Sequence, residues 1–272
     1  MNRRLRIVLL AVVVAATVVA IARSDPRAIG RALAGMSWQW ATIAAVLNLA
    51  GVVIDAMRLR IIVGAEAPLT VWHALQAQLV GIVGNVLFPF KLGEGARAYM
   101  LTRQHEVATP TAVKMVLADR IIDALVLPIF VVGVSVLLPL PASVLRFRGW
   151  LLASAAATSV AIIAVGRHRG RLAAAIGASL ASWTARATIL WCMLRAFGLE
   201  LPLSATVTML VIVNLGIALV ATPGNVGSFE LASAAALALW SVPPDVAFSV
   251  GIATHLVEVV PPVVLGLVVG GW

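Results

Sequence analysis

Residues 8–22 read VLLAVVVAATVVAIA, a run that contains no charged side chain. Strands of membrane β-barrels alternate polar and apolar side chains, whereas a continuously apolar run is typical of a helix that crosses the bilayer. Similar apolar runs recur along the rest of the chain. The sequence therefore predicts an all-α, polytopic integral membrane protein.

The composition excludes other classes of protein. Of the 272 residues, 62% are hydrophobic and 11% are charged, whereas soluble domains carry about 25% charged residues and disordered chains are rich in charge. The net charge of +9 is typical of basic loops facing the cytoplasm, so we predict no nucleic-acid partner. With Cys192 as the single cysteine, the sequence shows no intramolecular disulfide and no Cys/His metal pattern.

Several apolar segments approach the length of about 20 residues that a membrane helix needs. They are 5–22, 38–57, 70–88, 113–138, 149–166, 176–197, 203–221 and 246–269. The first segment follows MNRRLR and also resembles a signal peptide, but we interpret it as a membrane helix because further spans follow. No shift in composition divides the chain, so we predict a single domain over residues 1–272.

Two further apolar stretches, 88–101 and 222–240, are broken by proline and glycine. If every segment spans fully, most arginines and lysines fall on the outer side, against the positive-inside rule. If 70–104 enters and leaves on the inner side, most of them fall inside. The chain would then have about six full spans and two re-entrant hairpins, the second over 203–240. Inverted hairpins with broken helices are typical of transporters.

The first break offers a place for an anion. Pro89, Gly93 and Gly95 interrupt the apolar helix, and a new helix is expected to begin near Gly93. The free N–H groups at a helix start favour an anion, and Lys91 and Arg97 flank this point. We therefore predict a pocket for a phosphate head group.

Glu94 lies between these two basic residues. Its carboxylate either is the anion that satisfies the free N–H groups at the helix start or carries a proton. In the alternative interpretation, Lys91, Glu94 and Arg97 all lie at the level of the lipid head groups.

In the second break, Pro223, Gly224 and Gly227 precede a helix with Glu230 in its first turn. A charged side chain in hydrocarbon costs at least about 2.5 kcal/mol, so Glu230 needs a partner. Arg186 is the expected partner, since it also lies within an apolar segment without a local counter-charge. The alternative is a structural ion pair or a helix cap.

Two further groups of charges lie on predicted spans. Asp119, Arg120 and Asp123 have the spacing of neighbours on one helix, which predicts a structural salt bridge. His255 and Glu258 have the same spacing and form either a proton relay or a buried pair.

Near the end of the segment 38–57, Asp55, Arg58 and Arg60 are expected at the membrane interface. No nucleophile elbow, phosphate-binding loop or zinc motif occurs in the sequence, so we predict no catalytic residue, no metal and no cofactor.

Three short patterns follow one another along the chain. They are N-x3-P-x3-G-E-x2-R from Asn85 to Arg97, D-R-x2-D from Asp119 to Asp123, and P-G-x2-G-x2-E from Pro223 to Glu230. Together they resemble the signatures of the flippase-like membrane family, which includes the transmembrane region of bacterial lysylphosphatidylglycerol synthases. Asp119 stands where that family usually has Glu, and Asn225 replaces a glycine.

The resemblance implies a multi-pass protein of the bacterial inner membrane that moves a lipid between leaflets. The lipid is expected to be an anionic phospholipid or a polyprenyl-linked or hopanoid-type lipid. Lys91 and Arg97 would hold the head group, together with Asn85 and Arg186. Glu94 and Glu230 would supply counter-charge, gating or proton coupling.

Two other functions remain open. In the first, the chain binds a lipid as the partner of a cell-envelope lipid synthase or glycosyltransferase and transports nothing itself. Alternatively, it is an intramembrane enzyme that uses Glu94, Glu230 or His255, which the lack of a metal or nucleophile motif disfavours.

Overall fold

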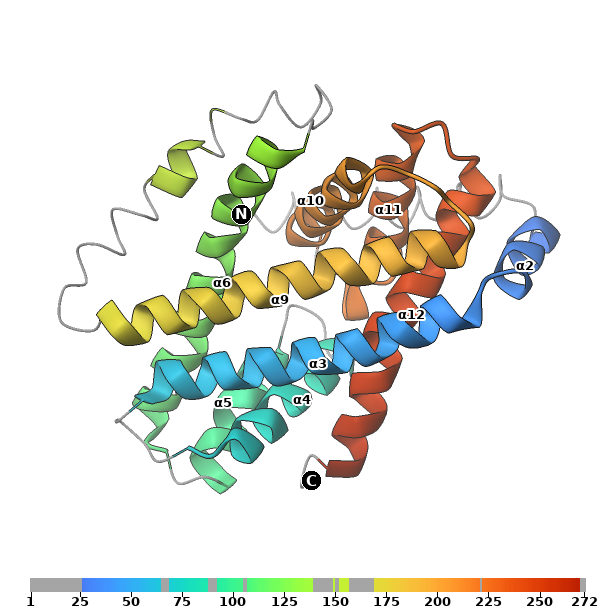
Figure 1. Ribbon diagram of the computed structural model, residues 1–272. Helices are drawn as coiled ribbons and strands as arrows, with labels where there is room; N and C mark the ends of the chain where they lie inside the picture. The colour runs from blue at the N-terminus through green and yellow to red at the C-terminus, as the bar shows by residue number, and fades with distance from the viewer. Residues whose placement is uncertain are drawn as a thin grey trace, which may run out of the picture. The chain divides into compact units, whose positions relative to one another are not determined.

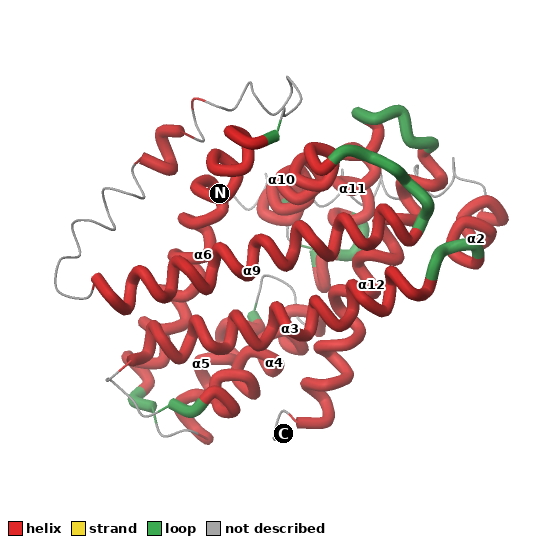
Figure 2. Tube along the Cα trace, in the orientation of Figure 1, coloured by secondary structure: helices red, strands yellow, loops and turns green. Residues whose placement is uncertain are grey.

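The computed structural model describes residues 26–64, 69–87, 92–104, 107–138, 149, 152–156, 169–220 and 222–269. Regular structure in these residues is entirely helical (Figures 1 and 2), which confirms the all-α class. The predicted span 5–22, most of the span 149–166, and the predicted site residues Pro89 and Lys91 lie outside the described residues.

Three of the described helices are long and apolar enough to cross a membrane. They are α3 (Trp38–Val63), α6 (Thr109–Leu137) and α12 (Pro244–Val269). The helix α9 (Arg169–Ala196) has 28 residues but carries several arginines. All four helices confirm predicted segments, and each extends beyond its predicted boundary by part of a turn or more.

Large apolar side chains are exposed on these helices. Leu117, Ile121 and Val136 of α6 and Val264 and Val268 of α12 are among them. A soluble protein rarely exposes so much contiguous apolar surface. These side chains would face lipid tails, and the chain is a polytopic membrane protein.

The chain divides into two compact units made of alternating segments. The first unit comprises Met1–Leu47, Asn85–Lys91 and Ala187–Pro261, and the second comprises Asn48–Gly84, Leu92–Arg186 and Pro262–Trp272. The helices α3, α4, α9 and α12 each contribute residues to both units. A single domain over residues 1–272 stays a prediction.

Each unit has its own buried apolar core. In the second unit, small and branched side chains from α3, α6 and their neighbours pack together, including Ala56, Leu59 and Met115. In the first unit, α3, α9 and α12 contribute Ala44, Met193 and Ala253, with α2 (Pro26–Ala34) packed beside them through Leu33.

The first predicted hairpin consists of α4 (Val71–Leu87) and α5 (Gly93–Gln104). At 1.5 Å per residue these helices are about 25 and about 18 Å long, so neither crosses a hydrocarbon core of about 30 Å alone. The two helices touch where only glycine fits: a Cβ on Gly84 would lie 2.8 Å from the Cα of Gly93.

The second predicted hairpin belongs to the first unit. It runs through α10 (Leu203–Leu219), the short turn η3 (Pro223–Asn225) and α11 (Ser228–Ala238). Gly224, Asn225 and Gly227 have φ of 58°, 60° and 84°, a left-handed backbone that glycine adopts at little cost. Each stretch contains two separate helices, and the turn η3 lies between the helices of the second one. Their orientation in the membrane stays a prediction.

Candidate functional site

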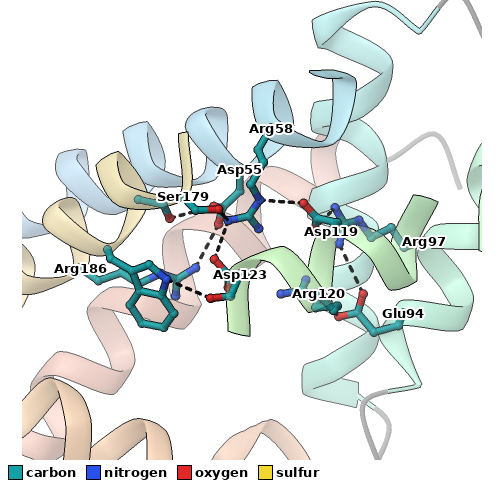
Figure 3. A network of polar contacts seen from close by, with 11 residues as sticks. Asp55, Arg58, Glu94, Arg97, Asp119, Arg120, Asp123, Ser179 and Arg186 are labelled. Atoms are coloured by element: carbon teal, nitrogen blue, oxygen red, sulfur yellow. Dashed lines mark hydrogen bonds and ion pairs between the residues drawn. The ribbon is translucent and has the colours of Figure 1, made fainter. Parts of the chain in front are cut away.

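A buried arginine organises the charged groups of the second unit (Figure 3). Arg58 of α3 is fully buried, and its Nε donates a hydrogen bond to Oδ1 of Asp119 at 2.8 Å. Its Nη1 donates to Asp123 and, at 3.1 Å, to Oγ of Ser179. Asp55 lies one turn earlier on α3, 3.4 Å from the same nitrogen. Arg58 thus joins α3, α6 and α9.

Asp119 connects this arginine to the first hairpin. Its second carboxylate oxygen, Oδ2, accepts a hydrogen bond from Nη2 of Arg97 on α5 at 2.8 Å. Both side chains are fully buried. Removing one partner of a buried ion pair leaves an uncompensated charge, which costs about 3–5 kcal/mol. Asp119 therefore fixes α5 against α3 and α6.

The network reaches a more accessible edge at Glu94. Its Oε1 lies 2.9 Å from Nε of Arg120, and its Oε2 accepts a longer hydrogen bond of 3.4 Å from Arg97. The Arg120 side chain is 39% exposed and that of Glu94 22%, whereas Arg97 is fully buried. Glu94 thus links the buried core of the network to a partly open surface.

A second edge of the network lies on α9. Asp55 accepts hydrogen bonds from Ser182 at 2.8 Å and from Nη2 of Arg186 at 3.0 Å. The Arg186 guanidinium also lies over the ring of Trp183, 5.3 Å from its centroid. Trp183 in turn donates a hydrogen bond to the main-chain oxygen of Asp123.

Opposite charges balance in this group, which we call the Arg58 network. Its arginines are Arg58, Arg97, Arg120 and Arg186, and its carboxylates are Asp55, Glu94, Asp119 and Asp123. When all are ionised the network is neutral. Among the described residues, the buried Nη2 of Arg58 and the Nε atoms of Arg97 and Arg186 have no hydrogen-bond partner. These three buried donors are therefore left unsatisfied by the described residues.

The structure corrects part of the sequence interpretation here. Asp55 and Arg58 are buried at the centre of the network instead of lying at the interface, and only Arg60 of that group is exposed. Asp119 and Asp123 share a face as predicted, but both face Arg58, and Arg120 pairs with Glu94 on another helix.

The first unit holds a smaller polar group around His255 of α12. Nδ1 of His255 lies 2.6 Å from Oε1 of Glu230, and its Nε2 lies 2.8 Å from the main-chain oxygen of Gly224. The other carboxylate oxygen of Glu230 accepts a hydrogen bond from the N–H of Gly227 at 2.7 Å. The ring of Phe229 stacks on the imidazole.

These contacts fix the number of protons that the pair holds. A main-chain oxygen only accepts hydrogen bonds, so Nε2 of His255 must carry a hydrogen. The short contact between Nδ1 and Glu230 then needs one further proton, which resides on either atom. The pair is thus an imidazolium with a carboxylate, or a neutral imidazole with a carboxylic acid.

One predicted partnership is wrong. Glu230 pairs with His255, whereas Arg186 pairs with Asp55, so these two residues do not form the expected pair. Both ring nitrogens of His255 are engaged by Glu230 and Gly224, and the predicted pairing of His255 with Glu258 stays a prediction. The alternative interpretation of Glu230 as a cap is confirmed, because it accepts the N–H of Gly227 at the start of α11.

The remaining predicted residues lie at the two breaks. Gly93 and Gly95 are in the first turn of α5, and Asn85 is in the last turn of α4. Within the first unit, a Cβ on Gly224 would lie 3.7 Å from the main-chain oxygen of Val86. The end of α4 and the second break are thus neighbours.

The described residues contain no group of three or more His, Cys, Asp or Glu side chains that could hold a metal ion.

Comparison with protein families gives a match: the model of the lysylphosphatidylglycerol synthase TM region matches residues 6–167 and 164–266. No curated protein matches the chain.

Proposed function

The chain belongs to the lysylphosphatidylglycerol synthase TM region family, and from this premise we propose that it is a lipid translocase of the bacterial inner membrane. It moves the head group of an anionic or lipid-linked molecule between the leaflets while the acyl chains stay in lipid. The family itself links the chain to lipid-related processes in a membrane. Translocation is the step that we add, and we assign no catalytic residue.

The contact of Glu94 with Arg97 and Arg120 carries the proposal. Charged groups within membrane helices are costly and generally functional. A phosphate head group has the same charge and acceptor chemistry as a carboxylate, so it can take the place of Glu94 beside these two arginines. Arg120 is the accessible contact, and Arg97, held by Asp119, lies behind it.

Charge balance links binding of the head group to Glu94. Because the Arg58 network is neutral, an added anion leaves it with a net negative charge in a medium that solvates charge poorly. Movement of Glu94 outward, or its protonation, restores neutrality. Glu94 therefore acts as an internal competitor that leaves when the lipid head group arrives and returns when it departs.

The proposal puts these charges, which lie near the ends of short helices around each break, at depth in the membrane. Transporters commonly bind their substrates near the bilayer midplane, where discontinuous helices end. The pair of Glu230 and His255, with one proton between Oε1 and Nδ1, lies at the second break. It supplies the proton coupling or gating that the family resemblance leads us to expect.

The test is translocation of a labelled phosphatidylglycerol in vesicles that contain the purified protein. We expect Glu94→Gln to bind the lipid more tightly, since the competing charge is gone, and to translocate it about tenfold more slowly. Arg120→Gln should weaken binding and translocation together. Glu200→Gln, on an 85% exposed side chain, is the matched control. Equal translocation by Glu94→Gln and wild type would refute the role of Glu94.

One observation favours a second function. Arg97 and Asp119 are fully buried and directly paired, as in a rigid scaffold. A lipid-binding partner of a cell-envelope lipid synthase or glycosyltransferase needs no moving parts. Binding of lipid without translocation by the purified protein, together with co-purification of such an enzyme, would support this function instead.

A further inference from the structure

A cavity opens in the second unit at the end of α3. Its volume is about 620 Å³, within the range of about 300–1,000 Å³ that small-molecule sites occupy. The end of α3 and the start of α9 form its walls, with the segment before α4. The described lining residues are Met57, Arg60, Ile61, Gly64, Leu69, Val71, Gly170, Arg171 and Ala174. None of them belongs to the Arg58 network.

Two arginines are the only charged residues among the described lining residues. Arg60 donates a hydrogen bond from Nε to the main-chain oxygen of Leu69 at 3.1 Å. This bond orients the guanidinium and leaves its two terminal nitrogens for another acceptor. Arg60 and Arg171 are both exposed. Nothing among the described lining residues offsets their positive charge.

Gly64 makes room for the second arginine. It has a φ of 54°, and a Cβ at this position would lie 2.5 Å from Nη1 of Arg171. The guanidinium thus lies directly against the glycine backbone, in space that any other residue would fill. Gly64, which directly follows α3, therefore shapes this side of the cavity.

The other walls are apolar. Met57, Ile61, Leu69 and Val71 line the cavity beside the arginines. Arginines at the end of a long apolar helix such as α3 lie at the level of lipid phosphates. A ligand that fits has a phosphate for the guanidinium groups and an apolar part for these side chains.

We infer that this cavity binds the phosphate group of an anionic amphiphile, at a site separate from the Arg58 network. The volume accepts a phosphorylated head group, and the acyl chains extend along the apolar walls into lipid. The same donors would accept a soluble phosphate, so the shared chemistry is a phosphate mono- or diester. The inference goes beyond the proposed function, because binding here requires no translocation.

The experiment measures retention of phosphatidylglycerol by the full chain in detergent, using native mass spectrometry. The double variant Arg60→Gln/Arg171→Gln is compared with Arg195→Gln, which removes a partly exposed arginine elsewhere. The Arg58 network is intact in both, so a difference between them reports the cavity. We expect the double variant to bind the lipid about tenfold more weakly. Equal retention by the two variants would overturn the inference.

Two further arms identify the source of the phosphate and guard against misfolding. Competition by inorganic phosphate at millimolar concentration would assign the site to soluble phosphates, and no competition would assign it to the lipid.

Gly64→Ala should displace the Arg171 guanidinium and weaken binding without changing any charge. Unchanged binding by a folded Gly64→Ala protein would contradict the geometry. Translocation by the same samples is measured separately, so failure of the cavity and failure of the translocase are distinguishable.

Discussion

The Arg58 network and the Glu230–His255 pair both bury charge within apolar helices, but they are built differently. The network joins α3, α5, α6 and α9 through eight charged side chains of balanced sign. The pair has one carboxylate, and that carboxylate also caps its own helix. The network thus depends on tertiary packing, whereas half of the pair is satisfied locally. The two regions should therefore respond differently to mutation.

Arg58→Gln should have the largest effect. It leaves Asp119 and Asp123 buried with one counter-charge fewer, so we expect a loss of about 3–5 kcal/mol in the free energy of unfolding. Thermal unfolding in detergent measures the loss. Arg195→Gln is the control, since that arginine pairs with an exposed glutamate. Similar unfolding of the two variants would show that the network does not hold the helices together.

Gly84→Ala should come next, because the added Cβ would lie 2.8 Å from the Cα of Gly93. Backbone cannot move aside cheaply, so the α4–α5 contact should open at a cost of about 1–3 kcal/mol. Gly95→Ala is the matched control on the same hairpin, since a Cβ there meets nothing within 4 Å. If both variants lose the same free energy of unfolding, α4 and α5 do not approach each other as closely as described.

Glu230→Gln should have a smaller effect on stability than Arg58→Gln. An amide oxygen still accepts the N–H of Gly227, and loss of the charge should cost about 1–2 kcal/mol. The variant cannot hold the shared proton. If that proton is used in transport, translocation by the wild type changes with pH and translocation by Glu230→Gln does not. His255→Gln should behave in the same way, and a pH profile unchanged in both would exclude the pair from transport.

Glu200→Gln should have the smallest effect. Glu200 pairs with Arg195 at 3.3 Å, but its side chain is 85% exposed. Solvent screens such pairs, so we expect at most about 0.5 kcal/mol. A larger loss of stability would mean that exposure is a poor guide to the strength of the charge pairs in this chain.

The sequence predicted helices more reliably than partners. The predicted span 203–221 matches α10 within two residues, and the breaks at Gly93 and Gly224 fall where proline and glycine interrupt apolar sequence. Such features depend on neighbouring residues alone. Asp55 and Arg58 lie near the end of a predicted span and therefore resemble interfacial charges in sequence. Only their contacts with α6 and α9 reveal that they are buried.

The spacing rule also did not identify the hydrogen-bond partner of His255. Glu258 lies on the same helical face, yet His255 bonds to Glu230, which is 25 residues away in sequence. A signal was present in part, since Glu230 stands at a helix start and needed a counterpart. The sequence analysis chose Arg186 because it has no local counter-charge, whereas His255 already had Glu258 one turn away. In the folded protein Glu230 pairs with His255, and Arg186 pairs with Asp55.

Hydrophobicity and helix breaking are local properties, so the amino-acid sequence alone determined that this is a helical membrane protein with two broken hairpins. It also marked Glu230 and Arg186 as charges within apolar sequence that need partners. Which partner each one found was decided by tertiary structure. In apolar surroundings a charge is stable only beside its opposite, and that neighbour is supplied by whichever helix packs there.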